Sequence, residues 1–147
     1  MRMSKWLAGA LLAASMVSIA GDEMPWAFNS APGEGYAIKL VSAEPAPGTP
    51  LVRGSSVTIK INATYTMSVA SEGSAFLVLQ DEKNRSIEAT RDPADFKATN
   101  AGGAITLSAT VAQVPKAKEL RVFVPLMPKG MNETTGEIVI RYPIVKK

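Results

Sequence analysis

The chain has 147 residues, with 16 lysine and arginine residues against 13 aspartate and glutamate residues, and it contains neither cysteine nor histidine. This composition excludes disulfides, thiolate nucleophiles, Cys/His zinc sites and Ser-His-Asp triads. It also removes the imidazole that most often acts as a general base or pH switch near neutral pH.

Residues 1–20 have the pattern of a secretory signal peptide. Arg2 and Lys5 accompany an apolar run of 15 residues, Trp6–Ala20, which is shorter than the ~20 residues that span a bilayer. A retained N-terminal anchor is the alternative interpretation. Cleavage removes two basic residues and leaves a net charge of +1 over 127 residues, too weak a field for nucleic-acid binding. We expect a protein of the periplasm or the cell exterior, with no membrane span after cleavage and no nucleic-acid partner.

Residues 21–34 show no hydrophobic period and contain two prolines and two glycines. They are expected to form an irregular leader before one domain that covers residues 35–147. Trp26 and Phe28 are the only large aromatic residues of this leader. We expect them to dock on the domain rather than to remain exposed for a partner.

From Gly35 onward the apolar residues recur with a period of two, which is typical of strands with one wet face. The alternation is clearest in Ser56–Met67 and Gly103–Val111. Residues 75–79 are apolar at every position, which is typical of a central strand. The same pattern predicts further strands at Tyr36–Ala43, Ser74–Asp81, Leu120–Leu126 and Ile138–Ile144, and a weaker one at Ser86–Thr90.

Turn-forming residues separate these runs. Glu44–Pro50 holds three prolines and a glycine, so we expect it to cross between sheets or to form a rigid bend. Asp92–Phe96 has the pattern of one helical turn, with Asp92 as the cap and Pro93 at the first position. Six or seven short strands predict an all-β fold, an immunoglobulin-like two-sheet sandwich with Greek-key connections. A small barrel uses the same alternation and is the competing architecture.

The order of these elements resembles that of bacterial immunoglobulin-like or fibronectin-III-like modules, including the cell-adhesion-related modules of surface proteins. The resemblance rests on the first strand and bend (Ile38–Leu51), the turn at Arg53-Gly54 and the alternating strand that begins Val57–Ile61. It implies a binding or structural module. It carries no functional residue from that family to this chain.

A second resemblance concerns Lys39–Gly48, which is similar to the first strand and bend of CopC-type periplasmic copper-resistance proteins. Those proteins are immunoglobulin-like sandwiches, and their copper site uses histidine together with acidic ligands. This chain has no histidine, so the resemblance supports the fold and leaves the copper chemistry without its ligands.

For the other candidate sites, a structural role explains the residues better than a functional one does. Methionine thioethers bind Cu(I), but the methionines that follow the signal peptide form no Met-x-x-Met cluster, and core or loop packing is the better interpretation. The loop carboxylates Asp81, Glu82, Asp92 and Asp95 lack calcium-loop spacing and are interleaved with basic residues, as in a solvated loop face. Carboxylate pairs such as Asp81/Glu88 lack an aromatic platform for sugars. We therefore expect no enzyme activity, no catalytic residues, no cofactor and no metal ligands.

Residues 119–128 are apolar on both faces. We expect Phe123 and the rest of the first half to be buried, while Pro125 indicates an edge strand or a strand end. Exposure is expected from Leu126 to Met131. The candidate partner-contact residues are therefore Leu126, Met127 and Met131.

These features predict a non-catalytic exported binding or accessory module of the bacterial envelope that recognises a protein or an envelope component. The alternative is a metal-binding periplasmic carrier related to CopC-type proteins but without the histidine site. Nothing in the sequence identifies the ligand or the oligomeric state.

Overall fold

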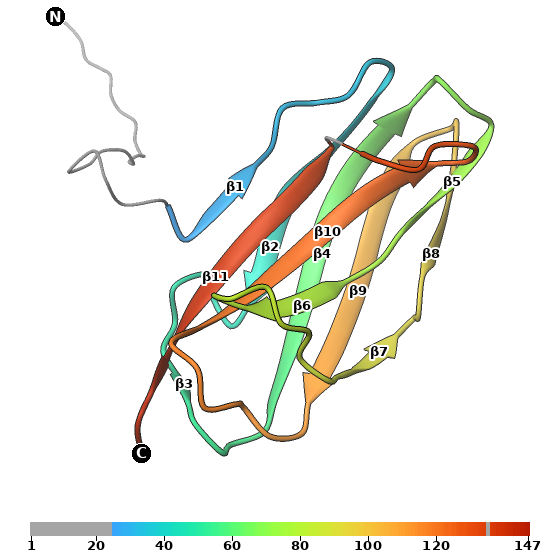
Figure 1. Ribbon diagram of the computed structural model, residues 1–147. Coiled ribbons are helices and arrows are strands. Elements are labelled where there is room, and N and C mark those ends of the chain that lie inside the picture. The colour runs from blue at the N-terminus through green and yellow to red at the C-terminus, as the bar shows by residue number, and fades with distance from the viewer. Residues whose placement is uncertain (1–24, 135) are drawn as a thin grey trace, which may run out of the picture.

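The computed structural model describes residues 25–134 and 136–147, so the predicted signal peptide at residues 1–20 lies outside the described part (Figure 1). The described residues form eleven strands and contain no helix. The strands are β1 (Ala27–Asn29), β2 (Tyr36–Glu44), β3 (Leu51–Val52), β4 (Val57–Met67), β5 (Glu72–Ala75), β6 (Val78–Asp81), β7 (Thr90–Asp92), β8 (Phe96–Thr99), β9 (Gly103–Val111), β10 (Glu119–Pro128) and β11 (Glu137–Val145).

The strands form two sheets that face each other (Figure 1). The seven-stranded sheet has the order β1-β11-β10-β5-β8, with β3 also beside β11 and β6 also beside β10. The four-stranded sheet has the order β2-β4-β9-β7. Every pairing is antiparallel except the short pairing of β3 with β11. Neither sheet closes on itself, so the fold is a two-sheet sandwich and not the small barrel.

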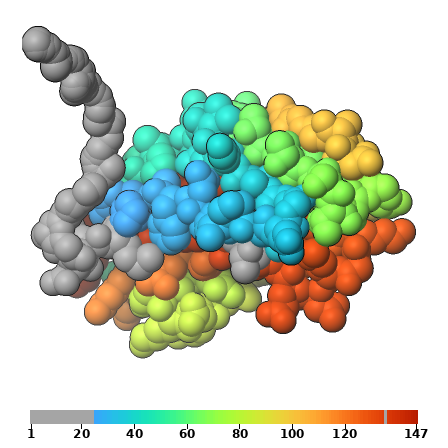
Figure 2. Space-filling view, turned by 90° about the horizontal axis from the view of Figure 1, so that it is seen from above, coloured from blue at the N-terminus to red at the C-terminus, as the bar shows by residue number. Residues whose placement is uncertain are grey.

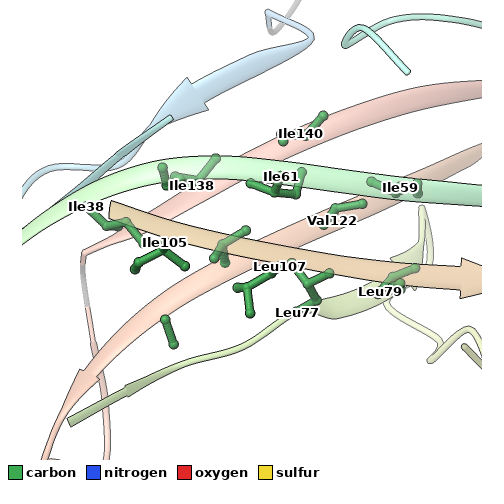
Figure 3. Packing of buried hydrophobic residues seen from close by; sticks show 14 of the residues in the cluster. Ile38, Ile59, Ile61, Leu77, Leu79, Ile105, Leu107, Val122, Ile138 and Ile140 are labelled. Carbon is green, nitrogen blue, oxygen red and sulfur yellow. The ribbon is translucent and has the colours of Figure 1, made fainter. Parts of the chain in front are cut away.

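The core lies between the sheets and consists of one side of each long strand. Figure 3 shows apolar side chains of β4 and β9 meeting those of β6, β10 and β11. The alternation that predicted these strands places every second residue inward, and Ile59, Leu107 and Val122 are completely buried. Each buried Leu, Ile or Val side chain contributes roughly 1.5–3 kcal/mol by removing apolar area from water. A core of this size holds the sandwich without a disulfide.

The proline-rich segment after β2 crosses from the four-stranded sheet to β3 of the seven-stranded sheet, as predicted. Tyr142 on β11 is fully buried, and its hydroxyl donates a hydrogen bond of 2.7 Å to the carbonyl of Pro45. Burial raises the pKa of this hydroxyl well above its ordinary value. Gly48 donates its backbone N–H to the carbonyl of Arg141 at 2.9 Å. The two hydrogen bonds fasten the bend to β11.

The segment expected to be an irregular leader contains β1, which pairs with Ile138–Ile140 of β11. Figure 2 shows this segment, in blue, along one side of the sandwich between the two layers. It also contacts the opposite sheet, because the Asn29 side-chain oxygen accepts the backbone N–H of Leu40 at 3.1 Å. The sequence missed this strand because three residues are too few to show a period.

The predicted single strand at Ser74–Asp81 is two strands, β5 and β6, which pair with different parts of β10. This break explains why Pro125 lies in a central strand rather than at an edge. Leu126 donates its backbone N–H to the carbonyl of Gly136, on the β11 side of β10. Successive backbone N–H groups of a strand point to opposite sides, so an N–H at position 125 would point toward β5 and β6. The ladder is interrupted there, and the missing N–H of proline costs no hydrogen bond.

Two weaker predictions are wrong. Residues 86–89 form no strand; Ser86 makes only an isolated bridge to Gln80, and β7 begins at Thr90. Asp92–Phe96 is not a helical turn, because Asp92 pairs with Ser108 at the end of β7 and Phe96 begins β8. The Phe96 ring packs edge-on against Tyr65, with the ring centroids 6.0 Å apart.

Candidate binding surface

The two outer faces of the sandwich differ in chemistry. The outer face of the four-stranded sheet carries hydroxyl, amide and charged side chains from β4 and β9. Several of them hydrogen bond to each other across the strands, as Thr58 does with Thr110 at 2.9 Å and Thr106 with Asn62 at 2.9 Å. These groups satisfy one another or face water, as expected of a solvated sheet face.

The outer face of the seven-stranded sheet is apolar at its centre. Phe28 pairs with Val139, Val139 pairs with Phe123, and Phe123 pairs with Val78, so these four residues form a row across four strands. Paired residues share a face of the sheet. We call these four residues the apolar row. Val139 is 7% exposed, and the other three are half-buried. Phe123 therefore lies on the surface, where the sequence predicted burial inside the domain.

Two arginines flank the apolar row at the next outward-facing positions. Arg121 on β10 and Arg141 on β11 are directly paired, and both bind the carboxylate of Glu119. Arg141 contacts Oε1 through Nε at 3.0 Å and Nη2 at 2.7 Å, while Arg121 contacts Oε2 through Nε. Burial opposes ionisation of Glu119, but the hydrogen bonds from Arg141 and Arg121 hold its pKa below the ordinary value of 4.5.

Trp26 completes this corner of the face. Its ring lies over the Arg141 guanidinium, 4.9 Å from Cζ to the ring centroid, and its backbone carbonyl accepts the Arg141 N–H at 2.7 Å. The indole also covers Gly48, where an added Cβ would lie 2.8 Å from ring atoms. Trp26 docks as predicted and still exposes 44% of its surface. A stacked guanidinium and an exposed indole are typical of contact surfaces.

The three predicted contact residues do not form one patch. Leu126 is completely buried, because the alternation of β10 continues through Pro125 and places it inward with Val124. The expectation that Leu126 is exposed is therefore wrong. Met127 is half-buried and faces outward from β10, while Met131 is half-buried and packs against the core. Sequence reasoning missed Glu119, Arg121 and Arg141, although their odd-numbered positions in the alternation marked them as outward-facing.

The loop carboxylates have structural partners. Asp81 is 5% exposed, not solvated as predicted, and it accepts the N–H groups of Lys83 and Arg85 and the Arg85 Nε. Backbone hydrogen bonding, led by that of Arg85, outweighs burial and lowers its pKa. Glu82 accepts the backbone N–H groups of Lys118 and Glu119. Within residues 25–134 and 136–147, no three carboxylates gather closely enough to hold a metal ion.

An open groove of about 680 Å³ lies between residues 85–90 and 110–116, at one end of the sandwich. Its charged groups Arg85, Glu88 and Lys116 are exposed, and its one buried charged group, Asp81, is already bound by Arg85. Solvent screens charges in such positions, so the groove is a weaker candidate than the outer face of the seven-stranded sheet.

No protein-family model matches the chain, and no curated protein matches it significantly. The two resemblances drawn from the sequence therefore rest on residue patterns alone. In the part of the chain that the structure describes, no helix has the length and apolarity to cross a membrane. The fold and the surface together define an all-β two-sheet sandwich with one polar outer face and one outer face that is apolar at its centre.

Glu119→Gln and Glu137→Gln form a matched pair with opposite expected effects. The lowered pKa of Glu119 means that its ionised form stabilises the fold above pH 4.5, and that this contribution is lost as the pH falls through the folded-state pKa. Burial raises the pKa of Glu137, so its ionised form opposes folding at neutral pH. At pH 7, Glu119→Gln should lower the free energy of unfolding by about 1–3 kcal/mol, while Glu137→Gln should leave it unchanged or raise it.

Urea unfolding of both variants at pH 7 and pH 3 checks this prediction. Both differences from the wild type should shrink at pH 3, where the carboxylates are largely protonated in the unfolded chain. Equal destabilisation by the two variants at pH 7 would contradict the assigned role of Glu119.

Gly48→Ala and Gly54→Ala together distinguish the cost of backbone strain from the cost of displacing the Trp26 ring. The two glycines have φ values of 85° and 86°, so either substitution should cost about 1–2 kcal/mol of stability. Only the Cβ at position 48 meets the indole, since nothing lies within 4 Å at position 54. In a Trp6→Phe background, where Trp26 is the only tryptophan, Gly48→Ala should shift the fluorescence emission to longer wavelength. An identical spectrum in both variants would show that Trp26 does not rest on Gly48.

Proposed function

We propose that this protein is a non-catalytic, exported binding or accessory module of the bacterial envelope, and that it recognises a protein partner through the outer face of the seven-stranded sheet. The observation that carries the proposal is the contrast between the two outer faces. One face carries hydroxyl, amide and charged groups, several of which hydrogen bond to each other, whereas the other places the apolar row beside Trp26 and two arginines.

The composition of this face supports recognition of a protein. Aromatic residues and arginine are enriched at interfaces between proteins, where they supply most of the binding free energy. The surface is also pre-organised, because Glu119 fixes both guanidinium groups and a regular sheet carries the aromatic rings. Pre-organisation lowers the entropy that binding must otherwise overcome.

We also propose the finer, immunoglobulin-like arrangement for the sandwich. The order β2-β4-β9-β7 in one sheet, opposite β11, β10 and the β5/β6 pair in the other, is similar to the strand order of immunoglobulin constant-type domains. Domains of this class commonly bind proteins through exposed strands and loops. Export to the periplasm or beyond rests on the signal-peptide pattern of residues 1–20.

Site-specific photo-crosslinking in the producing cells tests the proposed surface. A benzoyl-phenylalanine side chain replaces Phe123 in the apolar row or, as a control, Thr106 on the polar face. Irradiation should join the protein to an envelope protein from position 123 and give little or no adduct from position 106. Thr106 is an exposed strand residue, so the control has a comparable backbone setting.

Three results would contradict the proposal. They are an absence of adducts at position 123, equal adducts at both positions, and fractionation of the native protein with the cytoplasm. Circular dichroism of the two purified proteins checks that each variant keeps the strand content of the wild type.

A further inference from the structure

We infer that the partner segment is acidic: the face binds a peptide stretch in which a carboxylate pairs with Arg121 while a neighbouring apolar side chain packs on Phe123. The inference rests on the proposed function and names the chemistry of the partner for that same surface. It follows from the hydrogen bonds that the two arginines make and from the spacing between Arg121 and the apolar row.

The two arginines are not equivalent. Arg141 uses Nε and Nη2 for Glu119 and donates Nη1 to the carbonyl of Pro25 at 3.3 Å. Arg121 uses only Nε for Glu119, and within the described residues no hydrogen bond engages its Nη1 or Nη2. Its side chain is 32% exposed. Arg121 therefore holds a fixed guanidinium whose two outer nitrogens remain available to an incoming group.

The net charge of Glu119, Arg121 and Arg141 favours an anionic partner group. One carboxylate, Glu119, lies against two guanidinium groups, so the group of three carries a net positive charge. The nearby loop carboxylate Glu82 keeps its negative charge, but it accepts the backbone N–H groups of Lys118 and Glu119 and makes no ion pair with either guanidinium. A planar guanidinium with two open donors matches the two oxygens of a carboxylate, and such charge-assisted pairs are stronger than neutral hydrogen bonds.

The spacing between Arg121 and Phe123 requires the partner's anionic group to lie close to an apolar side chain. Arg121 and Phe123 are alternate residues of β10, so their side chains leave the sheet about 7 Å apart. The apolar row crosses four strands, a width of about 14 Å at the usual strand separation. A peptide with an aspartate or glutamate close to an apolar residue satisfies both requirements. A basic segment lacks the anion, and a purely polar segment lacks the apolar side chain, so neither satisfies both requirements.

Selection from a displayed library of random 12-residue peptides on the full chain supplies the probe. Peptides that depend on Phe123 should contain aspartate or glutamate within four residues of an aromatic or aliphatic residue more often than the unselected library does. For the strongest synthetic peptide, replacing its acidic residue by the corresponding amide should weaken binding about tenfold or more. Binding should also weaken as the salt concentration rises.

Variants of the protein assign the effect to Arg121. Arg121→Gln should reduce the difference between the acidic and amide peptides to less than about twofold, and Arg121→Lys should retain part of it because the charge remains. Lys60→Gln removes the same charge from the exposed polar face and should leave both affinities unchanged. Unfolding in urea should confirm that each variant remains folded under the binding conditions.

The outcomes separate this inference from the proposed function. If selected peptides require Phe123 but bind equally well as acids and as amides, the acidic partner is overturned and the binding surface stands. If Arg121→Gln leaves the preference for acid intact, Arg121 is not its source and the inference also fails. If no selected peptide loses affinity in Phe123→Ser, both the surface and the acidic partner are overturned.

Discussion

The alternation of side chains along β10 is the constraint on which the rest of this structure depends. Leu120, Val122, Val124 and Leu126 point inward and are completely buried against the opposite sheet. The residues between them must therefore point outward, and they include Arg121 and Phe123 of the proposed surface. A one-residue slip in the pairing of β10 with β11 would exchange the two sets and place a guanidinium in the core. Closing the core and presenting the outer face are consequences of one register.

Glu119 extends this constraint from packing to electrostatics. A carboxylate that is 8% exposed loses hydration, and burial alone would favour its neutral form. Two arginines that the β10–β11 register brings together reverse that preference and are themselves held in place. The arrangement leaves Arg141 committed to the protein and Arg121 partly open. Trp26 adds a stacking contact from the edge of the sheet, and Gly48, which has no Cβ, leaves room for its ring.

Local patterns predicted the long strands well, because a strand with one buried face alternates apolar and polar residues along its sequence. Gly103–Val111 matches β9 at both ends, and Ser56–Met67 differs from β4 by one residue. Short elements such as β1 carry no period and depend on pairing with β11. The Glu119–Arg141 pair joins residues 22 positions apart, and only the register between strands brings them together. The burial of Leu126 was predictable from the alternation of β10, but its neighbours are also apolar, so the alternation is hard to see there.

Hydroxyl-radical footprinting of the full chain, alone and with the envelope partner captured through position 123, tests the proposed surface most directly. The method reads solvent access to side chains and is most sensitive to aromatic residues and methionine. Partner binding should protect Trp26, Phe123 and Met127, while the exposed Val41 and Val69 should keep their free-state reactivity. Protection of Val41 or Val69 with unchanged reactivity at Trp26 and Phe123 would contradict the proposed surface.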